Sequence, residues 1–404
     1  MSGLLDGVRV VDFTQVISGP YAGFMLAQQG AEIVKLEQPT GGDQSRSMMT
    51  PTGPFAAAGQ SPMFLSFNAG KRSLAIDLKR PEARAIVAKL VAQADVVIEN
   101  FKAGAIARLG YGYDWAKAIK PEIVYCSISG FGQSGPKAGA PAYDPIIQAN
   151  SGMMTLTGFD GVTGPTKVGF WVCDMSTGIT AAFAIAAALS RQARTGAGAY
   201  LDVSMLDVAA SLISPMINNY LNFGVEPALM GNGSPAGSSV SSIYETADGL
   251  LQVAAATQGQ FNAQARALAR EDLIADPRFL DRQARIANAA ALREELLKSF
   301  ATADARYWET KLAKAGVPAG AVLTIPQMTA DPQVTGRGLI KTAPAPDGLN
   351  GEFRTVGAPF RVDNVTDTAL PTTPNLGQHT DAVLGEIGYS AAEIVAFRAA
   401  GVVG

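Results

Sequence analysis

The sequence predicts an α/β protein with a doubly wound parallel sheet in a large domain and a second, smaller domain. Two observations support this. Short apolar runs alternate with amphipathic helical stretches through the first half, the order that gives a parallel sheet covered on both faces. A chain of 404 residues, 48% hydrophobic, is also too long for one ordinary core and apolar enough to build two.

The alternation of elements can be followed from the N-terminus. A strand at 8–13 leads to Gly19-Pro20, and Pro20 suits the first position of a helix that extends to residue 29. The apolar run 32–36 predicts the next strand. The following elements are a helix at 81–94 that starts at a proline, strands at 96–98 and 123–128, an alanine-rich helix at 175–194 and a strand at 201–203. Ligand sites are expected where such strands end.

The chain changes character at residues 226–242, which are rich in Gly, Ser and Pro. We interpret this stretch as a functional loop that leads into a small domain at about 243–328, with a helix at 293–313. A proline-rich connector at 343–374 precedes a last helix at 391–400. The predicted boundaries are therefore 1–225 for the large domain, 226–330 for the small domain, and 331–404 for a connector that returns to the large domain.

Composition and charge exclude several classes of function. A formal net charge of -3 provides no general basic field, so nucleic acid is an unexpected partner. Two cysteines cannot build a metal cluster or a disulfide framework, and a single histidine argues against zinc sites and histidine-based triads. The first residues lack signal-peptide features, and the longest largely apolar run, 179–189, is too short to span a bilayer. We expect a cytoplasmic protein without a membrane partner, whose chemistry depends on carboxylates.

Asp174 is the main candidate among those carboxylates. It directly precedes the predicted helix at 175–194, where an aspartate is typical of an N-cap, but the same position favours the ionised carboxylate that a nucleophile needs. From the residues alone both roles are open. The adjacent Cys173 is a weaker candidate, because a free cysteine is more often a small buried apolar residue and no histidine lies nearby in the chain.

Residues 130–135 match the pattern G-x-G-x-x-G after a predicted strand. A dinucleotide-binding fingerprint must open a helix, whereas Pro136 and Pro141 follow here and indicate a loop. The pattern therefore does not predict a nicotinamide cofactor.

Taken together, motifs distributed along the whole chain resemble those of CoA-transferase family III, which includes formyl-CoA:oxalate transferases, carnitine CoA-transferases and alpha-methylacyl-CoA racemases. The matching motifs are LDGVRVVDF at 5–13 with Gly19-Pro20, GAEIVKLE at 30–37, GKRS at 70–73, ADVVIENF at 94–101, SGFGQSGP at 129–136, Tyr143-Asp144, Asp174 with Thr177-Gly178, Arg194-Thr195-Gly196, and LGQHT at 376–380. Each motif alone is weak, but their number and order make the resemblance specific.

The resemblance implies a fold and a reaction. The fold is a Rossmann-like large domain built from both chain ends, with a smaller α+β domain inserted between them and two chains interlocked as a homodimer. The reaction moves coenzyme A from an acyl-CoA, such as succinyl-CoA, to a small carboxylic acid. Asp174 would form first an acyl anhydride and then a CoA thioester, with no cofactor besides the CoA substrate.

The resemblance also implies positions for the substrates. The groove for CoA would be lined by Val16, Ser18, Lys71, Arg72, Asn100, Phe101 and Arg108. From the residues alone, Lys71 and Arg72 are adjacent cations in an expected turn after Gly70, where a charge pair is usually solvated. The substrate acid would meet Ile17, Tyr143, Asp144, Gly231 and Gly233, the two glycines in a lid that continues through Ser234, Gly237, Ser238 and Ser239. Gln38 replaces an arginine and Ile17 replaces the glutamine that holds oxalate in formyl-CoA:oxalate transferases, so oxalate is not the expected acid. His379 is expected to be structural.

Three alternatives remain beside CoA transfer. In the family's racemases a histidine precedes the aspartate of a Gly-His-Asp motif, where this chain has Tyr143, whose ordinary pKa of about 10 disfavours proton exchange near neutrality. A noncatalytic CoA-binding subunit of a heteromeric transferase is the second alternative, which the retention of Asp174 disfavours. A nicotinamide-binding protein ranks last.

Overall fold

The computed structural model describes residues 3–49, 52–233, 240–363 and 369–404. They divide into two compact units. The first comprises Met1–Met154, Lys167–Glu226 and Gln333–Gly404, and the second comprises Thr155–Thr166 and Pro227–Pro332. The sequence placed residues 155–166 with the large domain, whereas in the structure they belong to the second unit.

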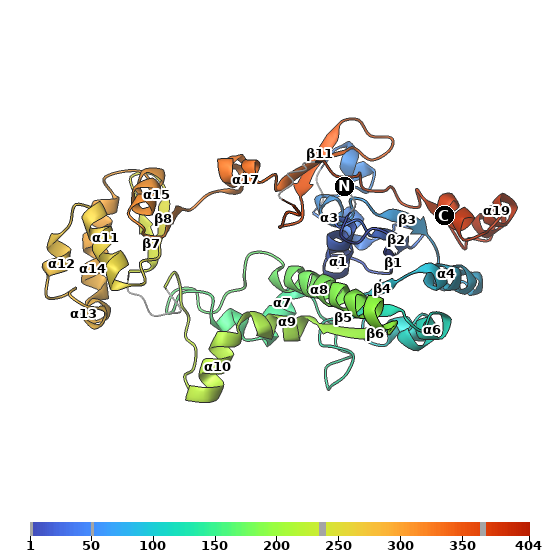
Figure 1. Ribbon diagram of the computed structural model, residues 1–404, viewed down its shortest axis with the longest axis horizontal. Coiled ribbons are helices and arrows are strands. Elements are labelled where there is room, and N and C mark those ends of the chain that lie inside the picture. The colour runs from blue at the N-terminus through green and yellow to red at the C-terminus, as the bar shows by residue number, and fades with distance from the viewer. Residues whose placement is uncertain (1–2, 50–51, 234–239, 364–368) are drawn as a thin grey trace. The chain divides into compact units, whose positions relative to one another are not determined.

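The first unit is built on a six-stranded parallel sheet with the strand order β3-β2-β1-β4-β5-β6 (Figure 1). The strands are β1 (Arg9–Asp12), β2 (Glu32–Glu37), β3 (Arg72–Ala75), β4 (Val96–Glu99), β5 (Val124–Ser129) and β6 (Ala199–Ser204). The winding reverses between β1 and β4, which makes the carboxyl ends of these strands the expected ligand site. This topology confirms the predicted doubly wound parallel sheet.

Helices cover both faces of this sheet, because successive side chains of each buried strand point to opposite faces. On one face α1 (Ser18–Ala27) and α8 (Val172–Thr195) bury Leu26 and Ile185 against β4 and β5. On the other face α4 (Pro81–Gln93) and α18 (Thr380–Glu386) bury Val87 and Leu384. The C-terminal segment therefore completes one layer of the first unit.

Strand β3 and helix α18 were missed in the sequence. Residues 71 and 72 were expected in a turn, but Arg72 begins β3, a strand of only four residues that is too short for a periodicity to be recognised. The proline-rich connector also contains an antiparallel pair, β10 (Ile340–Pro344) and β11 (Glu352–Val356).

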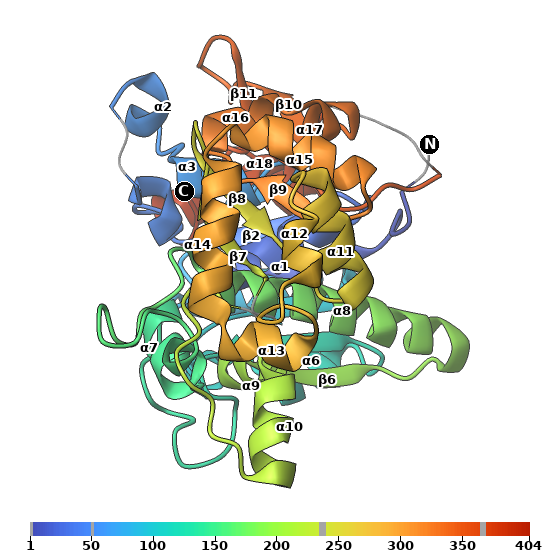
Figure 2. The ribbon, with the colours of Figure 1, turned by 90° about the vertical axis from the view of Figure 1, so that its left-hand side faces the viewer.

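The second unit has its own sheet and core. Strands β7 (Ser242–Glu245), β8 (Leu250–Val253) and β9 (Ala319–Ala321) form an antiparallel sheet, and Figure 2 shows α14 and α15 beside β7 and β8. The helix predicted at 293–313 is two helices, α14 (Ala289–Phe300) and α15 (Ala305–Lys314). The chain breaks between them because Asp304 caps α15 by accepting a hydrogen bond from the Tyr307 amide.

The remaining helices are short. They are η1 (Gln44–Ser47), α2 (Pro54–Ala57), α3 (Pro62–Phe67), α5 (Ala105–Arg108), α6 (Tyr113–Ile119), α7 (Asp144–Asn150), η2 (Met153–Thr155), α9 (Met205–Leu212), α10 (Ser214–Phe223), α11 (Gln258–Ala267), α12 (Asp272–Ala275), α13 (Arg282–Ala287), α16 (Ile325–Ala330), α17 (Pro332–Gly336) and α19 (Ala391–Ala399).

Helix α8 is longer than the sequence suggested. Its 24 residues, with a mean hydropathy of 1.6 over an 18-residue window, are long and apolar enough to cross a membrane by length and composition alone. The expectation that no segment reaches this length was wrong, because it considered only the run 179–189. Buried residues of α8 pack on α1, where Gly178 allows close approach: a Cβ there would lie 2.7 Å from the Ser18 carbonyl oxygen. This packing is typical of a core helix.

Candidate active site

A cavity of about 360 Å³ opens at the carboxyl ends of β1, β4 and β5, where the winding of the sheet reverses. The structure brings seven of the predicted site residues to it: Val16, Ile17, Ser18, Asn100, Phe101, Tyr143 and Asp174. All of them belong to the first unit. Their convergence from the β1–α1 loop, the segment after β4, the loop before α7 and the start of α8 defines the candidate active site.

Asp174 is not the N-cap of α8. The helix begins at Val172, so Asp174 is its third residue, and the N-cap position is occupied by Trp171, which makes no capping hydrogen bond with its side chain. The capping acid is Asp144, whose Oδ2 accepts hydrogen bonds from the amides of Cys173 (2.7 Å) and Asp174 (3.1 Å). The Asp174 side chain is thereby left available to the cavity.

The expected contact of Asp144 with substrate is therefore corrected. Its carboxylate is buried, and Oδ1 accepts a hydrogen bond of 2.6 Å from Gln148, so both oxygens are occupied within the protein. Asp144 does not line the cavity, whereas its neighbour Tyr143 is exposed and does. The function of Asp144 is to fix the first turn of α8.

The electrostatic environment of Asp174 favours its protonated form more than the sequence indicated. Burial, followed by the nearby Asp144 carboxylate, raises the pKa of Asp174 to about 7. The neighbouring hydroxyl and amide of Ser18 favour the ionised carboxylate and oppose this rise in the pKa. The sequence predicted that the helix end would favour ionisation, but burial outweighs that effect. The carboxylate consequently becomes the major form only above about pH 7.

Asn100 supports the cavity through the backbone of the β1–α1 loop. Its Oδ1 accepts from the Gln15 amide (2.8 Å) and its Nδ2 donates to the Gln15 carbonyl (2.7 Å). Both ends of the Asn100 amide are therefore occupied. The amide of the next residue, Phe101, donates to Glu99 at 2.8 Å, which holds the segment after β4.

The structure does not place Lys71 in the site. Its Nζ is completely buried, 2.9 Å from Asp12 Oδ2 and 2.9 Å from the Pro20 carbonyl. The sequence suggested a solvated cation in a turn, but a fully buried ammonium bound to these groups has no access to a phosphate. The expectation that Lys71 binds CoA is therefore corrected.

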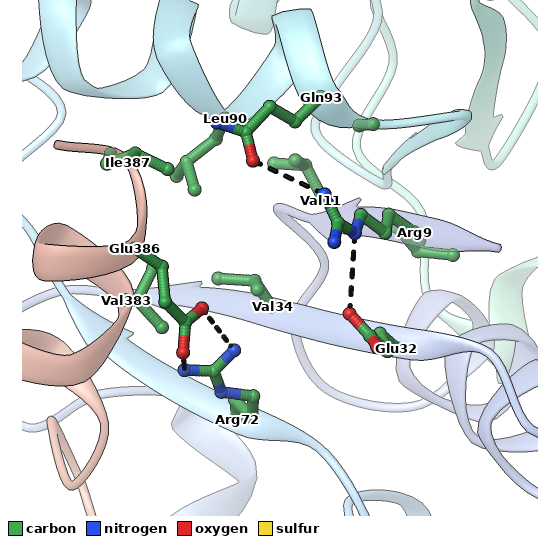
Figure 3. Close-up of a pocket in the computed structure, with 12 residues that line it drawn as sticks. Arg9, Val11, Glu32, Val34, Arg72, Leu90, Gln93, Val383, Glu386 and Ile387 are labelled. Atoms are coloured by element: carbon green, nitrogen blue, oxygen red, sulfur yellow. Dashed lines mark hydrogen bonds and ion pairs between the residues drawn. The ribbon is translucent and has the colours of Figure 1, made fainter. Parts of the chain in front are cut away.

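Arg72 lies at the opposite end of the sheet. It lines a separate cavity of about 650 Å³ at the amino ends of β1, β2 and β3 (Figure 3). There it forms a bidentate ion pair with Glu386, with N···O distances of 2.7 and 2.6 Å. Arg9 in the same cavity contacts Glu32 and Gln93. The structure therefore does not bring Arg72 to the cavity at Asp174, and a contact of Arg72 with CoA stays a prediction.

Other predicted residues stay outside the cavity at Asp174. Arg108 is exposed at the end of α5 and does not line the cavity. Gly231 and Gly233 belong to the second unit, where the Gly231 amide donates to the Gly158 carbonyl at 2.8 Å. Ser234, Gly237, Ser238 and Ser239 lie outside the described residues. A role for these residues in CoA binding or in a lid remains a prediction.

Three further residues or segments behave in the structure as the sequence indicated. Burial, followed by Asp144 and Asp174, raises the pKa of Cys173 to about 12, which keeps the thiol protonated and argues against a cysteine nucleophile. The segment 130–135 forms a loop after β5, and the next helix, α7, begins only at Asp144. His379 Nδ1 accepts a hydrogen bond from the Ser73 amide, in agreement with a structural role.

Sequence reasoning missed Ser129, the last residue of β5. It lines the cavity, is 8% exposed, and its Oγ is buried without a hydrogen-bond partner among the described residues. A buried hydroxyl without a partner is unusual in a folded protein and often marks a position completed by a ligand. The available sequence signal was its place at the carboxyl end of a predicted strand and at the start of the motif at 129–136.

Comparisons with known proteins find relatives in sequence and in structure. The model of CoA-transferase family III matches residues 5–380. The succinate–glutarate CoA-transferase of Agrobacterium fabrum is 38% identical, covering 95% of each chain. The succinyl-CoA:mesaconate CoA-transferase of Haloarcula hispanica is 37% identical over 96% of this chain and 97% of its own. The crystal structure of a CAIB/BAIF family protein from Brucella suis superposes with a TM-score of 0.83 at 35% identity, covering 96% of this chain and 100% of that protein.

Proposed function

Because the chain belongs to CoA-transferase family III and is a CoA-transferase, we propose that it transfers coenzyme A between short dicarboxylic acids by covalent catalysis at Asp174. The observation that carries this proposal is the position of Asp174: an acid at the carboxyl ends of the strands that lines the same cavity as Ser18. A carboxylate held in this way can act as a nucleophile toward a thioester.

Each step of the proposed reaction conserves the thioester energy. An Asp174 oxygen attacks the thioester carbonyl carbon, the carbon–sulfur bond breaks, and an acyl-aspartyl anhydride and the CoA thiolate result. The thiolate attacks the Asp174 carbonyl carbon, which releases the first acid as a carboxylate and leaves an aspartyl-CoA thioester. The incoming carboxylate attacks that thioester to give a second anhydride and the thiolate. Attack of the thiolate on the new acyl group forms the product and restores Asp174, with no net consumption of protons.

The relatives' names support short dicarboxylic acids as substrates, since those enzymes act on succinate and glutarate or on succinyl-CoA and mesaconate. Ile17 in the cavity is apolar and buried, and Ser129 carries a buried hydroxyl that has no partner among the described residues and could turn toward an oxygen of the acid. Succinyl-CoA as donor and glutarate as acceptor are the first pair to test.

The test combines turnover with trapping. Wild-type protein should form glutaryl-CoA from succinyl-CoA and glutarate, and added hydroxylamine should convert Asp174 into a hydroxamate that mass spectrometry locates on its peptide. A hydroxamate on any other residue, or turnover without a trappable intermediate, would contradict the mechanism. Exchange of the α-proton with solvent without an acceptor acid would instead indicate the racemase alternative.

We further propose that the chain acts as a homodimer. Helix α10 has no buried residue, and it exposes Leu221 and Phe223 at 70% and 77%. Phe183 on the outer side of α8 is also largely exposed. Such apolar side chains are typical of a surface that a partner covers. Sedimentation equilibrium should give twice the chain mass, and replacing Leu221 and Phe223 with glutamate should weaken the association.

A further inference from the structure

The β1–α1 loop, residues 13–17, connects the sheet to the helix that carries Ser18. Within it Val16 has φ 71°, in the left-handed region. A β-branched residue is rarely found there, because its branched Cβ approaches the backbone too closely, and such a conformation persists only when surrounding contacts impose it. The contacts that impose it therefore control where Ser18 lies.

One buried ion pair contacts this loop directly. Asp43 Oδ1 accepts a hydrogen bond from the Val16 amide at 3.1 Å, while its Oδ2 lies 2.8 Å from Lys35 Nζ. Lys35 in turn donates to the Thr14 carbonyl at 2.6 Å. Both side chains are completely buried, and the contacts hold the loop on each side of Gln15.

A second buried pair contacts the loop's beginning and the helix that follows it. Asp12 Oδ1 accepts from the Thr14 amide at 2.8 Å, and Oδ2 pairs with Lys71 at 2.9 Å. Lys71 also donates to the carbonyl of Pro20 in the first turn of α1. The same four charges, Asp12, Lys35, Asp43 and Lys71, thus fix backbone groups from residue 14 to residue 20.

None of these four residues lines the cavity at Asp174, so a direct role in binding or chemistry does not explain them. Burying two acids and two bases costs more free energy than burying apolar residues of similar volume. A contribution to stability alone therefore does not explain why these ion pairs are present. The two acids and the two bases balance in charge. Burial raises the pKa of Asp43, but Lys35 and the hydrogen bonds from the amides of Ser45 and Val16 outweigh burial and lower this pKa to about 2.

We propose that these two buried ion pairs are a positioning device for the nucleophile: they hold Val16 in its strained conformation so that the Ser18 amide and hydroxyl face Asp174. This proposal deepens the proposed function and rests on it for its catalytic consequence. The structural part does not depend on the reaction. Ser18 and Asp174 line the same cavity, and when the loop relaxes, the Ser18 hydroxyl and amide move away from Asp174 and no longer favour its ionised form.

The experiment compares Asp43→Ala with Asp43→Asn. Asparagine keeps an oxygen for the Val16 amide, whereas alanine removes it. The readout is the titration of the Asp174 carboxyl, followed by nuclear magnetic resonance in protein with carboxyl-labelled aspartate and assigned with Asp174→Asn. We expect the Asp174 pKa to rise above its wild-type value in Asp43→Ala and to stay close to it in Asp43→Asn. We expect kcat to fall roughly 100-fold in Asp43→Ala, the effect of misplacing a reacting group by about 1 Å.

Substitution of Val16 provides a rescue that a merely structural role of Asp43 does not predict. Glycine adopts a positive φ without strain, so Val16→Gly combined with Asp43→Ala should return the Asp174 titration toward wild type. Asp304→Ala, which removes the capping aspartate of α15, is the matched control and should leave that titration unchanged. In Asp43→Ala the Lys35 ammonium is buried without its carboxylate partner. If this charge prevents folding, the double variant Lys35→Met/Asp43→Ala removes the contact of Asp43 with the Val16 amide and leaves no unpaired charge in the interior.

A folded Asp43→Ala variant in which Asp174 titrates as in wild type would overturn the proposal, whatever its turnover. The proposal also fails if Val16→Gly does not shift the titration back. If the titrations behave as expected while wild-type protein transfers no CoA, the proposed function fails and the positioning of Asp174 stands.

Discussion

The two ends of the parallel sheet each carry a cavity, and the two differ in how their charged groups are satisfied. At the amino ends, in the larger cavity of about 650 Å³, Arg72 is paired with Glu386 and Arg9 with Glu32. At the carboxyl ends, in about 360 Å³, Asp174 lies beside the neutral groups of Ser18 and makes no ion pair among the described residues. The larger cavity is therefore not the one that contains the proposed nucleophile.

The difference distinguishes the end of the sheet at which we propose that the reaction takes place. Paired charges at the amino ends stabilise the folded protein and leave little for a ligand to satisfy. At the carboxyl ends a carboxylate with a raised pKa, a strained Val16 and an unpartnered Ser129 hydroxyl lie around one cavity. Such unsatisfied groups cluster at functional sites. Matched substitutions at the two ends should therefore differ in their effect on turnover.

The largest expected effect comes from removing one carboxylate at each end. Asp174→Asn should lower kcat by about 10³-fold or more, because the amide cannot form the anhydride. Glu386→Gln, the matched change in the other cavity, should leave kcat within about twofold. Steady-state transfer assays with succinyl-CoA provide the measurement. Equal losses in both variants would mean that the reaction does not depend on the end of the sheet at which the acid lies.

The next prediction concerns the pH dependence of the reaction. Since the pKa of Asp174 is about 7, kcat/KM should rise about tenfold per pH unit below that value and level off above it. The fall at low pH arises because only the ionised form attacks the thioester. A rate that stays constant from pH 5 to pH 8 would contradict the raised pKa.

The same pKa predicts an effect on stability. Asp174 has a higher pKa in the folded protein than the ordinary value of 3.8, so the folded state binds its proton more tightly. Its contribution to the free energy of unfolding is therefore most favourable below about pH 4 and is lost as the pH rises to about 7. The free energy of unfolding of Asp174→Asn should exceed that of wild type by about 4 kcal/mol at pH 8, and the gain should shrink toward pH 4. Urea unfolding at pH 4 and pH 8 measures this free energy for both proteins. A gain of the same size at the two pH values would show that it does not arise from the ionisation of Asp174.

A smaller effect is expected from Ser129→Ala. The KM for a dicarboxylic acid should rise about 3- to 10-fold, equivalent to one neutral hydrogen bond of ~1 kcal/mol. The KM for a monocarboxylic acid of the same chain length should not change, because that acid has no distal oxygen for the hydroxyl. Ser66→Ala, which removes an exposed hydroxyl bonded to the Pro62 carbonyl, is the control. An equal rise for both acids would place Ser129 outside acid recognition.

Much of the fold could be predicted, because the parallel strands are buried on both faces and form continuous apolar runs in the sequence. The strands at 32–36 and 123–128 differ from β2 and β5 by one residue at their ends. Strand β3 was missed because it has four residues and its first residue, Arg72, belongs to a charged pair that was expected in a turn.

The candidate site was predictable only in part, for a physical reason. The motifs identified Asp174, Ser18 and Tyr143, all of which line one cavity. They could not show that Asp144 caps α8 or that Lys71 is buried, because both depend on partners 29 and 59 residues away. Burial and long-range pairing decide whether a charge faces a ligand or the protein interior, and neither is encoded locally.

The smallest expected effect tests the amino end directly. Arg72→Met removes a bidentate but partly exposed ion pair, so the free energy of unfolding should fall by only about 0.5–1 kcal/mol. The KM for acyl-CoA should stay within about twofold of wild type, because Arg72 and Asp174 line different cavities. Glu386→Gln breaks the same pair and leaves the arginine in place. If Arg72→Met alone raised the KM for acyl-CoA tenfold, the guanidinium itself would contact CoA, and the contrast between the two ends of the sheet would be wrong for this residue.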